Sequence, residues 1–301
     1  MLAIIKNYRL HFISTILFLL IDAFLNIDNQ HIISFILIFS FGLIHGANDI
    51  QLIQKKTVNY DLNFFIYTIL LYIVIVILGI MIFFFIPKFG LIFFIFFSSF
   101  HFGEQHLGTY TNEIVNPFIK GIIYSAYGSS ILGLLFSLQW LETHVIIYKI
   151  SELFIPKKFM ELYFYIGFII FFISSLFFGE LRKFLWVEII LIFLIGFFFS
   201  RAPLLLSFSL YFVFWHSIPS IFDQLNFLYE KDNSRKIKYL LSSLPYWVMS
   251  LLGLFGFYFY FHSKPETFLP LFFSFLAAIT FPHTIVMGWL KIYKSKINNK
   301  F

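Results

Sequence analysis

Ten stretches of this chain are apolar enough to cross a lipid bilayer as helices. A spanning helix takes about 20 mostly apolar residues, and because a bilayer core cannot hydrogen-bond exposed backbone groups, such runs fold as helices. The sequence therefore predicts an all-α fold, a polytopic integral membrane helical bundle that forms a single transmembrane domain over residues 1–301. The predicted spans cover residues 10–26, 31–53, 63–86, 89–103, 117–138, 162–178, 184–199, 203–221, 239–260 and 268–290.

The composition excludes a soluble fold and several kinds of site. Hydrophobic residues make up 60% of the chain and charged residues 12%, whereas soluble domains carry about 25% charged residues. The net charge of +6 does not indicate a nucleic-acid partner, because the Lys and Arg residues lie in short loops between apolar runs. The chain has no Cys, which excludes disulfides, thiolate metal sites and cysteine nucleophiles.

The positions of the basic residues predict the topology, because cytoplasmic loops are enriched in Lys and Arg. With the N-terminus placed in the cytoplasm, 15 of the 21 Lys and Arg residues fall on the cytoplasmic side of the ten spans. An even number of spans then returns the C-terminus to the same side. We therefore predict a multi-pass protein, surrounded by membrane lipids, with both termini cytoplasmic.

Four histidines lie inside apolar runs, where an ionisable side chain is costly and therefore points to function. His45, His101, His216 and His283 fall in the second, fourth, eighth and tenth predicted spans, which all run in one direction. Each lies about 12–15 residues from the start of its span, or roughly 18–22 Å at 1.5 Å per residue. The four imidazoles are thus predicted at one depth, and an all-nitrogen set suits Fe, Cu or Zn.

Acidic residues follow two of these histidines. Asp49 comes four residues after His45, and Glu104 comes three residues after His101, so each acid shares a helical face with its histidine. Either carboxylate is a candidate to orient an imidazole through its other ring nitrogen, or else lies at a solvated helix end. Four of the remaining histidines fall at span ends or in loops, where interfacial or solvated side chains are expected: His11, His31, His144 and His262. His106 lies just past a span end, and its position favours neither a solvated nor a buried side chain.

The segments around the four histidines resemble those of the Brp/Blh family of bacterial membrane β-carotene dioxygenases. They read GLIHGANDIQLI, FHFGEQH, FWHSIPS and FPHTIVM, and their order fits along nearly the whole chain. The resemblance implies an inner-membrane enzyme with non-haem Fe(II) held by histidines, which uses O2 to cleave β-carotene centrally to two retinals. It also implies a functional link to a microbial rhodopsin.

On this resemblance, His45, His101 and His216 fall on the iron ligands of the family. The family pattern has a further histidine four residues after His216, and here that position is Ser220. A serine hydroxyl is a poor ligand for Fe(II), so Ser220 is expected beside the ligands rather than among them. His283 is the predicted fourth ligand, ahead of His106 and Glu104, because it combines an apolar run with the predicted depth of the other three. A site of three histidines with open positions for O2 is the alternative.

Two other functions stay open on the residues alone. A chain that lost a ligand at Ser220 would be a non-catalytic carotenoid- or retinal-binding membrane protein, which would contain no iron. Buried histidines and an acid such as Asp49 also serve as relays in transporters and proton channels. A transporter needs an aqueous path across the whole membrane, whereas the enzyme needs a metal centre that is reached from the lipid.

Overall fold

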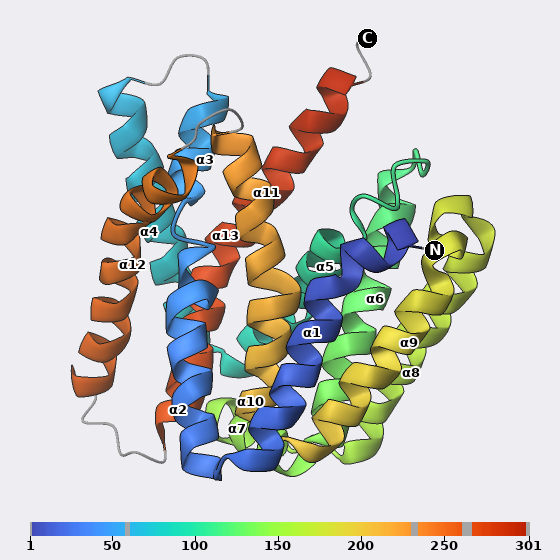
Figure 1. Ribbon diagram of the computed structural model, residues 1–301. Helices are drawn as coiled ribbons and strands as arrows, with labels where there is room; N and C mark the ends of the chain where they lie inside the picture. Colours follow the sequence, from blue (N-terminus) through green and yellow to red (C-terminus); the bar gives the residue numbers. More distant parts are fainter. Residues whose placement is uncertain (1, 58–60, 230–233, 261–266, 299–301) are drawn as a thin grey trace. The chain divides into compact units, whose positions relative to one another are not determined.

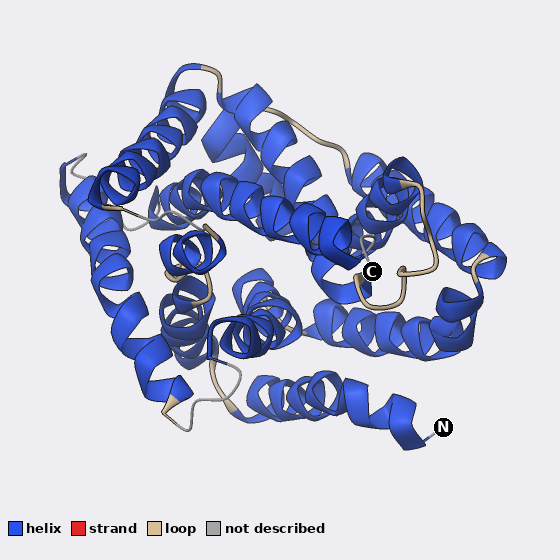
Figure 2. Ribbon diagram, turned by 90° about the horizontal axis from the view of Figure 1, so that it is seen from above, coloured by secondary structure: helices blue, strands red, loops and turns tan. Residues whose placement is uncertain are grey.

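A computed structural model describes residues 2–57, 61–229, 234–260 and 267–298. Regular secondary structure in this part of the chain is helical throughout, without a strand (Figures 1 and 2). The all-α prediction is therefore confirmed. In chain order, the helices are α1 (Leu2–Phe24), α2 (Ile27–Leu37), η1 (Ile38–Gly42), α3 (Asp49–Lys56), α4 (Leu62–Phe85), α5 (Pro87–Leu107), α6 (Pro117–Leu138), α7 (Trp140–Ser151), α8 (Lys157–Phe177), α9 (Gly179–Arg201), α10 (Leu204–Ser209), η2 (Leu210–Ser217), α11 (Ile218–Tyr229), α12 (Arg235–Tyr260) and α13 (Phe268–Asn298).

Seven helical stretches within the described residues are long and apolar enough to cross a membrane, which indicates a membrane protein. Each coincides with one of the ten predicted spans, but ten spans are not confirmed. The predicted spans 10–26 and 89–103 lie in helices α1 and α5, which are not among the seven. The seven are 62–85, 117–138, 157–177, 179–201, 204–229, 235–259 and 268–290.

The third unmatched span, predicted over 31–53, is broken in the structure. A π-helical segment, η1, follows α2, and a turn at residues 45–48 separates it from the short helix α3. Backbone groups at such a break need partners from the protein, since lipid supplies none. Trp247 Nε1 donates to the carbonyl oxygen of Phe39 at 2.5 Å, and Gln224 Nε2 donates to that of His45 at 2.8 Å. Side chains of later helices thus stabilise the break.

The chain divides into two compact units, each built from three separate stretches of sequence. The first unit contains residues 1–38, 95–148 and 153–219, and the second contains 39–94, 149–152 and 220–301. The last of these boundaries falls inside α11, between Pro219 and Ser220.

In the first unit, helix α6 packs closely against α5 and α8. The α5–α6 contact depends on two glycines: a Cβ atom built on Gly103 would lie 1.9 Å from the carbonyl oxygen of Tyr124, and one on Gly128 would lie 1.9 Å from that of Ser99. Only a residue without a side chain lets the two backbones meet in this way, as is common between membrane helices. The contact fixes the backbone of α5 on both sides of His101.

In the second unit, α13 packs against α3, α4 and α12. A Cβ atom on Gly79 of α4 would lie 3.1 Å from the Cα atom of Ala278 on α13, so these helices also approach closely. Near the start of α12, a hydrophobic cluster joins α3, α11, α12 and α13. Its buried members are Leu52, Leu225, Leu228, Tyr239 and Met287. This packing sets the positions of the segments that carry His45 and His283.

Candidate metal centre

The second unit brings two of the predicted ligands together. His45 lies at the start of the turn after η1, and His283 follows Pro282 within α13. Both side chains are buried. Their ring centroids lie 4.7 Å apart, with the ring planes at 84°. Residues that are 238 positions apart in sequence therefore present two imidazoles side by side.

Each of these two rings has an oxygen atom at its Nδ1. Nδ1 of His283 lies 2.9 and 3.1 Å from the two carboxylate oxygens of Asp49, and Nδ1 of His45 contacts the carbonyl oxygen of Gly42. The hydroxyl of Tyr72 donates to Asp49 at 3.0 Å. An Nδ1–H that donates to a carboxylate or carbonyl leaves the lone pair of a neutral imidazole on Nε2, the arrangement usual for metal-binding histidines.

A chain of buried hydrogen bonds supports the backbone at His45. Gln224 Nε2 donates to the His45 carbonyl at 2.8 Å and lies 3.2 Å from the hydroxyl of Ser220. The Tyr239 hydroxyl donates to Gln224 Oε1 at 2.8 Å, and Asn48 Nδ2 donates to the Tyr239 carbonyl at 3.2 Å. Ser220 therefore contacts a residue that holds the His45 segment.

Replacing Gln224 with Leu is expected to lower the stability of the protein and weaken metal binding. The change would leave the His45 carbonyl and the Tyr239 hydroxyl buried without this partner. Each lost bond would lower the free energy of unfolding by about 1–3 kcal/mol. Thermal unfolding of the purified protein and a metal titration measure the two effects. Ser274→Ala, which removes a bond within α13 at 2.9 Å, is the control. Unfolding and titration curves of Gln224→Leu that match those of the control would contradict this role.

The first unit brings the other two predicted ligands together. His101 lies on α5 and His216 on the π-helical segment η2. Both are buried, and their ring centroids lie 4.8 Å apart at 75°. The ring of Phe102 packs on His216 at 4.7 Å. Short π-helical segments frequently mark functional sites in α-helices, and His216 lies in one.

The chemistry of these side chains fits a transition metal. The two pairs offer four imidazoles, and neutral imidazole suits Fe, Cu and Zn. The Nδ1 contacts of His45 and His283 are of the kind that orient a histidine for metal binding. The remaining predicted acid, Glu104, is buried on α5, three residues after His101.

Comparison with known protein families shows to which family this chain belongs. The family model described as "Beta-carotene 15,15'-dioxygenase" matches residues 36–291. The chain belongs to the β-carotene 15,15′-dioxygenase family. No curated protein and no solved structure matches it. The residues that match the dioxygenase family model include all four paired histidines. The match confirms the resemblance seen in the four motifs.

Within this dioxygenase-family chain, Asp49 has a different partner from the one expected. A continuous helix would place Asp49 on the same face as His45, but the turn at residues 45–48 interrupts the helix between them. Asp49 instead contacts His283, whose sequence position gives no hint of this pairing. The predicted role, orienting an imidazole, fits the observed contact, but the histidine is another one.

Sequence reasoning missed a second polar cluster in the dioxygenase-family chain, centred on Glu188 of α9. Its carboxylate is buried and contacts Tyr8, His106 and Tyr127. His11, expected to be solvated, is buried beside them. Glu188 interrupts the apolar run LWVEIILIF, and a carboxylate inside such a run is itself a signal of function. His262 lies outside the described residues.

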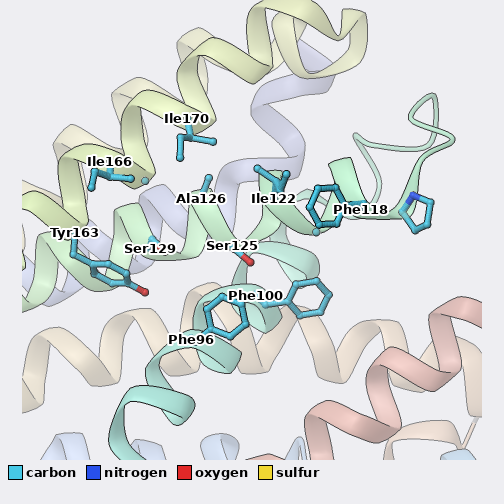
Figure 3. A pocket seen from close by; sticks show the side chains of 13 residues that line it. Phe96, Phe100, Phe118, Ile122, Ser125, Ala126, Ser129, Tyr163, Ile166 and Ile170 are labelled. Carbon is cyan, nitrogen blue, oxygen red and sulfur yellow. The ribbon is translucent and has the colours of Figure 1, made fainter. Parts of the chain in front are cut away.

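An apolar pocket of about 460 Å³ lies between α5, α6 and α8 of the first unit (Figure 3). Phe96 and Phe100 of α5 form one wall, and Ile166 and Ile170 of α8 form another. Tyr163 also lines the pocket, and its hydroxyl lies 2.6 Å from that of Ser99. His101 follows Phe100 directly, so it points about 100° away from that ring around the α5 axis.

Proposed function

We propose that this protein is a membrane Fe(II) dioxygenase that cleaves β-carotene centrally with O2 to give two molecules of retinal. Membership of the β-carotene dioxygenase family supports the reaction class. The observation that carries the proposal is the presence of two buried imidazole pairs, one in each unit, at ring distances of 4.7 and 4.8 Å.

We propose His45, His101, His216 and His283 as the residues that hold the iron. His283 takes the place of the histidine that the family has at position 220. Fe(II), when bound, would supply the activation of O2. Chain groups hold the ligands: Asp49 keeps the His283 ring in one orientation through Nδ1, and the Gly42 carbonyl does the same for His45.

The surroundings of these histidines suit an apolar substrate. The polyene of β-carotene partitions into the bilayer, so the substrate would arrive from lipid rather than from water. Aromatic side chains would hold it by dispersion and stacking, and Phe102 already packs against His216. The proposed location is the inner membrane with both termini cytoplasmic. A retinal product would serve a retinal-binding partner such as a microbial rhodopsin.

Expression in cells that accumulate β-carotene tests the proposal. We expect the orange colour to fade and retinal to appear in extracts, with about one iron per chain in the purified protein. His101→Ala in the same cells is the control, and it should leave the colour unchanged. Persistent colour and no retinal, with the protein present in the membrane, would disprove the proposed reaction.

A non-catalytic carotenoid-binding protein is the second candidate, and one observation favours it. Position 220, where the family pattern has a histidine, holds a serine that hydrogen-bonds to Gln224. Under this alternative, the purified protein would carry intact carotenoid in stoichiometric amount, would contain no iron, and would form no retinal. Iron content and pigment analysis of one preparation therefore separate the two candidates.

A further inference from the structure

The Glu188 carboxylate joins three other helices of the first unit. It accepts hydrogen bonds from the hydroxyls of Tyr8 on α1 at 2.5 Å and Tyr127 on α6 at 3.0 Å. Nε2 of His106 on α5 lies 3.0 Å from both of its oxygens. A buried carboxylate is costly unless it is fully hydrogen-bonded, and here three side chains from three helices supply the partners.

The His106 ring connects this carboxylate to the segment that carries His216. One face of His106 stacks on Tyr127, with centroids 4.6 Å apart and planes at 15°. Trp215 lies parallel to His106 at 6.3 Å and 16°. The ring of His11 packs edge-on against Trp215 at 4.7 Å. The indole of Trp215 is therefore confined by aromatic rings from α1 and α5.

The same two elements, α5 and η2, also carry the imidazole pair of the first unit. His106 lies five residues after His101 on α5, and Trp215 directly precedes His216 in η2. Several ring contacts join α5 to η2, among them His101 with His216 at 4.8 Å and His106 with Trp215 at 6.3 Å. Any shift of η2 along α5 would change these two contacts together, and with them the contact of Phe102 with His216.

We propose that Glu188 is a positioning residue for the imidazole pair of the first unit. Its bonds hold His106 in one orientation against Trp215, and this contact fixes the register of η2 on α5 and hence the separation of His101 and His216. π-Helical segments are rare and usually short, so a side-chain contact from a neighbouring helix would help to hold η2 in place. The proposal rests on the proposed metal-binding role of the two histidines.

The alternative is that the Glu188 cluster only stabilises the helical packing. A general loss of stability would affect the whole unit, whereas a positioning role predicts a local effect at η2. Tyr163→Phe is a matched control, because it removes another hydroxyl contact to α5, the one at 2.6 Å to Ser99. The Tyr163 hydroxyl bonds to Ser99 on α5 and to Ser129 on α6, both outside η2 and the Glu188 cluster.

Hydrogen–deuterium exchange of the metal-free full-length protein in lipid nanodiscs tests the proposal. In Glu188→Leu we expect amide exchange over residues 210–217 to rise about tenfold, while exchange in α8 stays as in the wild type. Fe(II) affinity should fall about 10–100-fold, as for other residues that orient metal ligands. Glu188→Gln keeps the side-chain shape and one acceptor oxygen, so it should restore part of the exchange protection and part of the Fe(II) affinity. It also replaces Glu188→Leu in this test if the Leu variant does not fold.

Two results would overturn the proposal. One is unchanged exchange over 210–217 in both Glu188 variants; the other is an equal rise there in Tyr163→Phe. Failure of the proposed function looks different: the wild type would then bind no Fe(II), while the exchange difference between Glu188→Leu and Tyr163→Phe would persist.

Discussion

His283→Ala is expected to abolish iron binding and retinal formation as completely as His45→Ala. The two imidazoles lie 4.7 Å apart, and each has an oxygen partner at Nδ1. Loss of His283 would remove one of the proposed nitrogen donors, and a water molecule would bind the metal less tightly in its place. We therefore expect Fe(II) affinity to fall at least about 100-fold. Iron per chain and retinal per cell measure the two losses.

Metal stoichiometry distinguishes a single centre from two separate ones. If one iron requires both pairs, the wild type holds one metal, and His45→Ala and His101→Ala each hold none. Residues that act as one unit are strongly non-additive, so the double variant should be no worse than either single one. Two metals in the wild type and one in each variant would contradict the single centre.

A matched control for these variants is His144→Ala. This histidine packs among aromatic rings of the first unit, with Trp140 stacked on it at 5.6 Å and Phe154 edge-on at 4.8 Å. Its removal should keep full iron content and activity. A His283→Ala protein that behaves like His144→Ala would show that His283 is a packing residue and that the iron has only three histidine ligands.

Asp49→Leu is expected to reduce Fe(II) affinity about 10–100-fold, because the residue orients a proposed ligand rather than binding the metal. Its carboxylate accepts from His283 and from the Tyr72 hydroxyl. In the Leu variant, the His283 ring and the Tyr72 hydroxyl would both stay buried without this carboxylate. Each lost bond would lower the free energy of unfolding by about 1–3 kcal/mol. Metal titration and thermal unfolding of the purified protein provide the two readouts.

Two further variants identify which contact of Asp49 matters. Asp49→Asn keeps one oxygen that can accept from His283 and should recover most of the affinity. Tyr72→Phe removes only the hydroxyl bond at 3.0 Å, so it should cost stability but little affinity. If Asp49→Leu binds Fe(II) as tightly as the wild type, the Asp49–His283 contact has no role in orienting a ligand.

Long apolar runs made the helical fold predictable, and polar residues inside them made the candidate ligands predictable. Helix α4, with no charged residue between Leu62 and Phe85, matches its predicted span within one residue. The break near His45 was not foreseen, because residues 31–53 keep an apolar average. The break depends on bonds from Gln224 and Trp247, and such distant partners leave no periodic pattern in the sequence.

The partners of the candidate ligands were harder to predict than the ligands themselves. Helical spacing paired Asp49 with His45, whereas the fold pairs it with His283, 234 residues away. Glu188 is predictable from its place in an apolar run, but unlike Asp49 and Glu104 it has no histidine close to it in sequence. Tertiary contacts between helices decide such pairings, and a single sequence does not display them.

The turn after His45 also affects the order in which the protein can be completed during synthesis. Its backbone and side chains need partners that the ribosome makes much later: Gln224 for the His45 carbonyl and Tyr239 for Asn48, which are 179 and 191 residues further on. Until α11 and α12 have entered the membrane, the unwound segment has polar groups that lipid cannot satisfy. The newly inserted N-terminal helices must therefore be shielded by water or by the insertion machinery.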